Sequence, residues 1–124
     1  MIDPYERHRQ AEAAREAALA DVARLLSEDR IDEAERAIQL VNADLSFHVN
    51  IAKLYQRRLE QLVSSGLTAQ TKPRAEAIFK QALMWAQTAY PEPQTEVEMS
   101  NYDSGRREDR ARLVRILGYE PTLD

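Results

Sequence analysis

Apolar residues recur along the chain at alternating steps of three and four residues, and this spacing predicts a structure built from helices. The clearest stripe comprises Ile31, Ala34, Ile38, Val41, Leu45, His48, Ala52, Tyr55, Leu59 and Leu62. Residues spaced in this way lie on one side of an α-helix. Because no Gly or Pro interrupts the stripe, residues 30–64 are predicted to be helical, with their apolar side facing the core.

Residues 30–64 fit two interpretations. In the first, one continuous helix spans them, with a length of roughly 50 Å at 1.5 Å per residue. In the second, the helix is broken near residues 42–46, because Asn42, Asp44 and Ser46 favour caps and turns over helix interiors. The unbroken stripe favours the first interpretation and the local residue preferences favour the second, so the sequence leaves both open.

Residues 4–27 are predicted to form a helix. Asp3 is a favourable N-cap, Pro4 fits the first helical position, and Glu6 stands where a capping-box acid reaches back. Ala is frequent along this stretch, and bulky apolar residues enter only in its second half. We expect the second half to be packed, and the first half either to lie close against a neighbour or to project into solvent.

Residues 73–90 are also predicted to form a helix. Its inward face comprises Ala75, Ile78, Phe79, Ala82, Leu83, Ala86 and Ala89, which follow the helical period. Together with the preceding segments it makes residues 1–90 a helical core domain. The predicted fold class is all-α, either a helical bundle or a short repeat-like array of helical hairpins, with three to five helices.

The C-terminal third is predicted to be less packed. Residues 91–105 are acidic, contain Pro and Gly, and have few bulky apolar residues, so we expect an extended linker. Residues 106–124 then comprise a short Arg-rich helix and a tail. Asp103 or Ser104 would cap this helix, and Gly118 would end it.

Composition limits the function classes only broadly. The chain has 124 residues, of which 44% are apolar and 31% charged, and this is enough for one domain with its own core. A net charge of -4 argues against a broad nucleic-acid-binding surface, and the lack of cysteine excludes disulfide and thiolate chemistry. The N-terminal residues lack the apolar segment of a secretory signal, and no apolar run is long enough for a membrane span. We therefore expect a cytoplasmic protein.

A helix that opens with Asp32, Glu33 and Ala34 continues with Ile38 and Val41, and the segment before it places Ala18, Val22 and Leu25 at small and bulky positions. In these positions the sequence of residues 18–91 resembles tetratricopeptide repeats, with the first set in the second helix of a repeat and the second set in its first helix. Residues 49–63 and 74–90 would form a second hairpin, which ends at Pro91. Members of this family stack helical hairpins into solenoids that bind partner peptides, so the resemblance implies such an array here.

Motifs for catalysis or for cofactor binding are not found in the sequence, and we predict no catalytic residue, cofactor or metal site. Asp44 and His48 have the i, i+4 spacing of two metal ligands, as do His8 and Glu12. Two ligands are too few for a site, so we expect His48 to be structural or partly exposed and His8 to form a solvated pair. An enzyme built around His48 is the last of our hypotheses.

Our first functional hypothesis is a non-enzymatic protein that binds a protein partner or a second copy of itself, because the helices offer more apolar surface than the core requires. Its candidate partner-binding residues are His48, Tyr55, Trp85 and Tyr90, although the aromatics among them lie on helical stripes and we expect them in the core rather than in a base-stacking platform. The alternative is a small nucleic-acid-binding or regulatory protein in which Arg106, Arg107, Arg110 and Arg112 contact phosphate. We favour a solvated helix whose arginines pair with the acidic residues 92–103.

Overall fold

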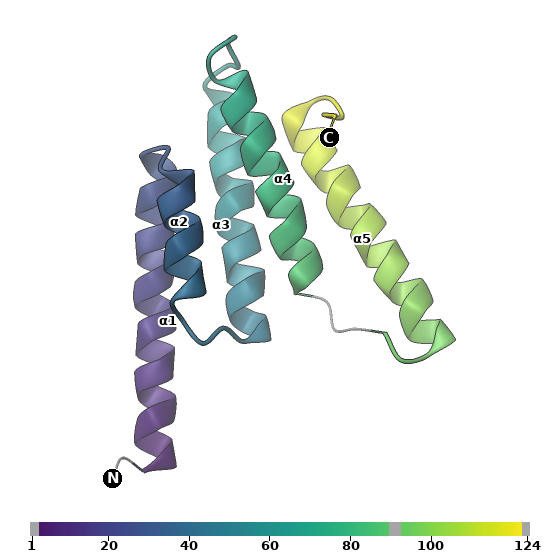
Figure 1. Ribbon diagram of the computed structural model, residues 1–124. Helices are drawn as coiled ribbons and strands as arrows, with labels where there is room; N and C mark the ends of the chain where they lie inside the picture. The colour runs from purple at the N-terminus through teal and green to yellow at the C-terminus, as the bar shows by residue number, and fades with distance from the viewer. Residues whose placement is uncertain (1–2, 90–92, 123–124) are drawn as a thin grey trace.

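The computed structural model describes residues 3–89 and 93–122, and within these ranges the chain is all-α, as predicted. Five helices and no strands are found there. The helices are α1 (Pro4–Ser27), α2 (Ile31–Gln39), α3 (Leu45–Ser64), α4 (Lys72–Thr88) and α5 (Glu96–Leu117) (Figure 1). None of these helices has the length and apolar character needed to cross a membrane.

The predicted bounds of α1 are confirmed, and local interactions explain them. The side chain of Asp3 accepts a hydrogen bond from the Glu6 backbone amide at 2.8 Å, and Pro4 occupies the first turn. At the other end, Asp29 has a φ of 61°. Because this left-handed conformation cannot continue a helix, the chain turns there and enters α2.

The interpretation with a broken helix is correct for residues 30–64. α2 ends at Gln39, and α3 begins at Leu45. The Asp44 side chain accepts a hydrogen bond from the Phe47 backbone amide at 2.8 Å and so caps α3. Leu40 is 86% exposed, and Leu45 is exposed too. The apolar stripe is therefore continuous in the sequence, but the break between α2 and α3 divides it into two separate buried surfaces.

The predicted helix 73–90 corresponds to α4, which begins at Lys72 and ends at Thr88. Tyr90 and Pro91, the predicted end of this helix, lie outside the described residues.

The predicted linker over residues 91–105 is wrong from residue 96 onward, because α5 begins there. The Thr95 hydroxyl accepts a hydrogen bond from the Glu98 amide at 3.1 Å, and a Glu98 carboxylate oxygen accepts one from the Gln94 amide at 2.7 Å. These bonds resemble a capping box, which stabilises a helix start. Asp103 and Ser104 are therefore not caps. Gly118 ends the helix as predicted, with a φ of 93°.

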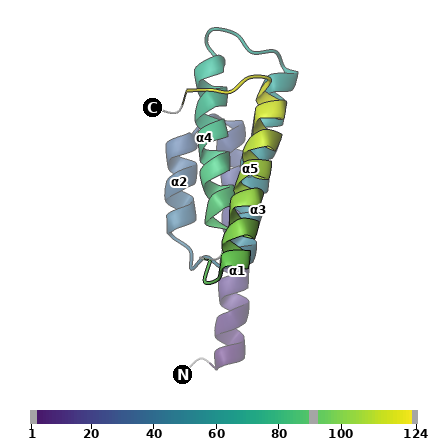
Figure 2. The same cartoon turned by 90° about the vertical axis from the view of Figure 1, so that its right-hand side faces the viewer.

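The helices form two layers. Figures 1 and 2 together show α1, α3 and α5 in one layer and α2 and α4 in the other. Each helix packs on the next along the chain for the pairs α1–α2, α3–α4 and α4–α5, and α3 also packs on α1 and α5. The chain therefore passes back and forth between the layers while the helices of the first layer stack side by side.

The core runs through the region between the layers. Its largest fully buried side chains are Tyr55, Phe47, Phe79, Leu26, Ile51, Leu59, Ile78, Leu113 and Val22. In α1 the buried residues are confined to the second half, Ala18, Val22, Leu25 and Leu26. The first half of α1 projects beyond the other helices (Figures 1 and 2), which is one of the two arrangements expected from its alanines.

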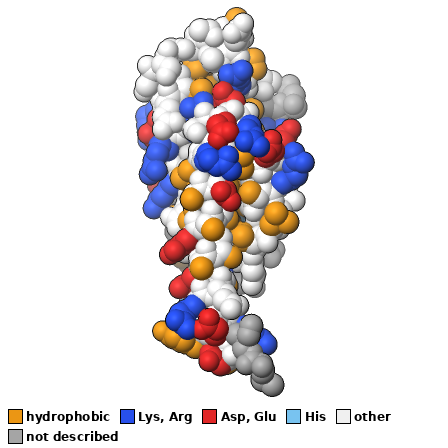
Figure 3. All heavy atoms as spheres, turned by 90° about the vertical axis from the view of Figure 1, so that its left-hand side faces the viewer, with side chains coloured by type: hydrophobic (Ala, Val, Ile, Leu, Met, Phe, Trp, Pro, Cys, Tyr) orange, Lys and Arg blue, Asp and Glu red, His pale blue; other side chains and the backbone are white. Residues whose placement is uncertain are grey.

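The end of the array formed by α1 and α2 has a mixed surface. Figure 3 shows hydrophobic side chains along this side, interspersed with Lys, Arg, Asp and Glu side chains. Exposed residues of α1 include Ala13, Ala17 and Ala20, which expose little apolar area each. Burial of the alanine-rich part of this surface by a partner would therefore contribute little binding free energy.

Replacement of Ile51 by Ala should destabilise the protein by about 2–5 kcal/mol, because Ile51 is fully buried and its loss leaves a cavity between helices. Chemical denaturation followed by circular dichroism measures the change. Leu40→Ala is the matched control, and its effect should stay within about 0.5 kcal/mol because Leu40 is exposed. Equal effects of the two substitutions would contradict the placement of Ile51 in the core.

Candidate functional site

The structure brings together three of the four residues that were predicted to bind a partner. His48 and Tyr55 lie on α3, and Trp85 lies on α4. The His48 ring stacks on the Trp85 ring with a centroid distance of 5.7 Å and an interplanar angle of 25°. The fourth, Tyr90, lies outside the described residues.

A carboxylate of α2 joins two of these aromatic residues. The Tyr55 hydroxyl donates a hydrogen bond to Oε1 of Glu35 at 2.5 Å, and Nε1 of Trp85 donates one to the same oxygen at 3.2 Å. Burial raises the pKa of Tyr55 above its usual value, and the Glu35 carboxylate adds to the shift. The network links α2 to both α3 and α4, so it holds this short helix in place.

The burial of these aromatics corrects the predicted partner-binding set. Tyr55 is fully buried and Trp85 nearly so, and their polar atoms are bound to Glu35. A partner cannot contact Tyr55 in this fold. Both Tyr55 and Trp85 belong to the core. Glu35 itself was not predicted. Its position next to the buried Ala34 was the sequence signal that could have indicated it.

His48 and Asp44 do not form a metal site with each other. One oxygen of the Asp44 carboxylate caps α3, and the other lies 3.4 Å from Nη2 of Arg15 on α1. Among residues 3–89 and 93–122, no group of three or more His, Cys, Asp or Glu side chains is placed to hold a metal ion. His8 pairs with Glu12 at 3.0 Å on the exposed part of α1, as expected for a solvated pair.

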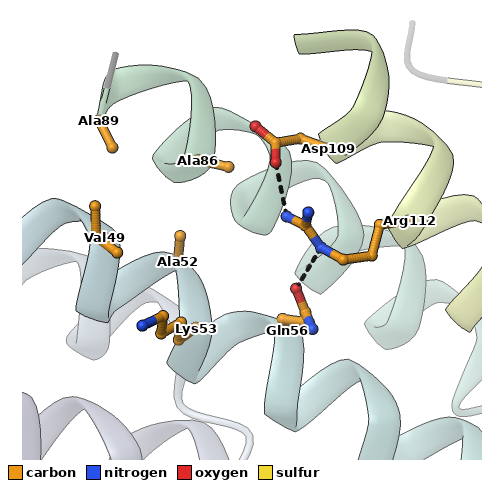
Figure 4. Close-up of a pocket in the computed structure, with 8 residues that line it drawn as sticks. All are labelled: Val49, Ala52, Lys53, Gln56, Ala86, Ala89, Asp109 and Arg112. Carbon is orange, nitrogen blue, oxygen red and sulfur yellow. Dashed lines mark hydrogen bonds and ion pairs between the residues drawn. The ribbon is translucent and has the colours of Figure 1, made fainter. Parts of the chain in front are cut away.

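A cleft of about 430 Å³ lies between α3, α4 and α5. It is lined by Val49, Ala52, Lys53, Gln56, Ala86, Ala89, Asp109 and Arg112 (Figure 4). The walls come from α3 and α5, which lie in the same layer, and the other layer contributes the two alanines Ala86 and Ala89 at the end of α4. Ala86 and Ala89 belong to the predicted inward face of this helix, but both are only partly buried.

The residues that α5 turns toward the other helices explain why the cleft is there. Leu113 and Leu117 are buried and hold the C-terminal half of α5 against the core. One and two turns earlier, the same side of α5 carries Asp109 and Arg106, which are polar. Figure 1 shows that α5 diverges from α4 toward its N-terminal end. Polar side chains and small alanines therefore occupy a place where bulky apolar residues would close the gap.

Hydrogen bonds fix the polar wall of the cleft. Arg112 donates from Nε to Oε1 of Gln56 at 2.9 Å and from Nη2 to Oδ1 of Asp109 at 2.7 Å (Figure 4). Asp109 is only 7% exposed, and a buried carboxylate needs a charged partner. The guanidinium of Arg112 is that partner. Arg112 thus connects α5 to α3 across the cleft.

The other arginines predicted to contact phosphate are mostly engaged within the protein. Arg106 donates to Gln87 at 3.3 Å, and its guanidinium lies 5.3 Å from the centroid of the Tyr102 ring. Arg110 pairs with Glu120 at 2.5 Å. For Arg107 no ion pair is found among the described residues. The expected pairing with acidic residues 92–103 is wrong for the described part of that segment, since the carboxylate partners of the α5 arginines are Glu120 and Asp109.

Comparisons with family models, with curated proteins and with solved structures return no match for this chain. The geometry of the cleft and of the Glu35 network is therefore the basis for assigning a function.

Tyr55→Phe should lower the free energy of unfolding by about 1–3 kcal/mol, because the substitution removes a hydrogen bond to a partly buried carboxylate. Thermal and chemical denaturation of the variant measure the loss. Tyr5→Phe is the control, since the Tyr5 side chain is exposed and should be replaceable without effect. A Tyr55→Phe variant as stable as the Tyr5→Phe variant would show that the Glu35 network does not hold α2.

The stability that Tyr55 contributes should also disappear at high pH. Its pKa is raised in the folded state, so the contribution is complete below the ordinary tyrosine pKa of about 10 and is lost as the pH rises further. The slope is at most about 1.4 kcal/mol per pH unit for one proton. The stability difference between the natural protein and Tyr55→Phe should therefore shrink above that pH. Tyr119 provides a comparison, because burial raises its pKa to about 12. The stability difference between the natural protein and Tyr119→Phe should shrink with pH in the same direction. A difference that grows with pH would contradict the assignment.

Proposed function

We propose that this protein is a non-enzymatic interaction protein that binds a segment of a partner protein in the cleft between α3, α4 and α5. The observation that carries the proposal is the apolar base of the cleft. Val49, Ala52, Ala86 and Ala89 line an open hollow with aliphatic side chains that the described helices leave partly exposed. Their exposed area becomes buried when a partner side chain enters, and this burial is favourable.

The arrangement of the helices supports the proposal. α1–α2 and α3–α4 are two consecutive helical hairpins, and α5 follows in the layer of α1 and α3 (Figure 2). This order is the one implied by the resemblance to tetratricopeptide repeats, whose members bind partner peptides. The cleft lies between two successive helices of one layer, where a stacked array presents its side chains to a ligand.

Self-association is the special case in which the partner is a second copy of this chain. Several large apolar side chains are exposed outside the cleft, and Leu40, Leu45, Val97 and Met99 are among them. Single exposed apolar residues are normal on a protein surface, so they do not by themselves favour a dimer over a different partner.

Nucleic-acid binding has less support than protein binding. Of the four arginines considered for phosphate contact, Arg106, Arg110 and Arg112 each have a hydrogen-bond partner within the protein. Binding phosphate would require them to exchange these partners. The apolar base of the cleft has no role in contact with phosphate, whereas a protein partner can contact both this base and the arginines.

Cross-linking in cells of the natural source tests the proposal. A photoreactive benzoylphenylalanine in place of Val49, which lines the cleft, should give adducts with a partner protein. The same group in place of Ala77, an exposed residue of α4 outside the cleft, is the matched control and should not give them. An additional Ala86→Trp substitution fills the cleft and should reduce the Val49 adduct by about tenfold or more.

Two results would contradict the proposed function. One is a set of adducts that is the same from position 49 and position 77. The other is an adduct from position 49 that persists with Ala86→Trp in a variant whose circular dichroism spectrum shows intact helices. An adduct with the mass of a dimer would identify the partner as a second copy.

A further inference from the structure

Within the described part of the chain, the residues that line the cleft carry a net positive charge. Its lining contains two cationic side chains, Lys53 and Arg112, and one carboxylate, Asp109. Asp109 pairs with Arg112, and no ion pair involving Lys53 is found among the described residues. Arg57 lies one turn further along α3, is exposed, and likewise has no ion pair in the described part of the chain. The local charge is therefore opposite to the net charge of -4 of the chain.

Arg112 is held in position before any partner binds. Gln56 and Asp109 fix the guanidinium from two helices (Figure 4). A guanidinium has five N–H donors, of which these two bonds use two. The Arg112 side chain is 41% exposed, so further donors are accessible from the cleft. Because the side chain is already ordered, a ligand that bonds to it loses less conformational entropy on binding.

The apolar base strengthens this preference. A carboxylate that enters beside Val49, Ala52, Ala86 and Ala89 leaves part of its water shell, and its attraction to a nearby cation increases as the surroundings become less polar. The guanidinium plane matches a carboxylate with two parallel hydrogen bonds. A lysine or arginine from a partner would instead meet Lys53 as a like charge.

Building on the proposed function, we infer that the partner segment in the cleft is acidic. An Asp or Glu side chain of the partner bonds to Arg112, the charge of Lys53 on the α3 wall adds to the attraction, and small aliphatic neighbours in its sequence cover the base. The occupant to which this inference commits is a segment of a different protein that carries such a carboxylate, and a second copy of this chain is an outcome of the test.

A selection from a library of random dodecapeptides displayed on phage tests this inference without knowledge of the partner. Peptides are selected on the natural protein and then depleted on the Ala86→Trp variant, so that only those that need the cleft remain. These peptides should be enriched in Asp and Glu, relative to the starting library, and depleted in Lys and Arg.

Synthetic copies of the selected peptides are then measured by fluorescence anisotropy. Lys53→Glu should weaken binding by about tenfold or more, whereas Lys53→Arg should retain it. Lys80→Glu is the matched control, because Lys80 is an exposed lysine of α4 that does not line the cleft, and it should leave binding unchanged. Lys53 is exposed too, so neither substitution disturbs the core.

The outcomes separate the acidic segment from the proposed function. Two outcomes would overturn the inference of an acidic segment and leave the proposed function standing. In one, the peptides that depend on the cleft show no enrichment in acidic residues. In the other, they bind Lys53→Glu as tightly as the natural protein. A selection that yields no peptides dependent on the cleft would overturn both. Selected peptides that match a segment of this chain would replace the foreign partner by a second copy.

Discussion

The packing of α3 against α4 is the interaction on which the rest of the fold depends. The stripe Phe47, Ile51, Tyr55, Leu59 and Leu62 is buried along the whole of α3, and this helix also contacts α1 and α5. Each of the other helices needs a buried neighbour, because short amphipathic helices are marginal in isolation. α3 supplies that surface to α1, α4 and α5, and α2 packs on α1.

Residues with strong local preferences made part of this fold predictable. Asp3 and Pro4 mark the start of α1 in the sequence, and Asp44 marks the start of α3, although the stripe across it obscured the break. The N-terminal half of α5 was missed because it buries little and so lacks apolar periodicity. Its capping residues Thr95 and Glu98 were the available signal, but the nearby Pro and Gly suggested a linker instead.

The candidate site was less predictable than the helices, since it depends on gaps and pairings between distant segments. Ala86 and Ala89 follow the same period as the core residues of α4, and among the described helices the divergence of α5 leaves them partly uncovered. Conversely, the aromatic Tyr55 suggested a binding surface, but Glu35, twenty residues earlier, binds its hydroxyl inside the protein. A sequence shows the period of a helix, but it does not show where a neighbouring helix diverges and leaves part of the apolar face uncovered.

The projecting half of α1 differs from the other helical segments in what maintains it. Up to residue 12 its interactions, the Asp3 cap, the Glu6–Arg9 pair and the His8–Glu12 pair, are local to the helix, and in the described part of the chain Arg15 is the first residue bonded to another segment, through Asn42 and Asp44. Amide hydrogens in these turns therefore exchange with solvent through local fraying, whereas those near Val22 require a far larger opening of the molecule. α1 thus combines a rigid anchored portion with an arm whose helicity depends on temperature and ionic strength.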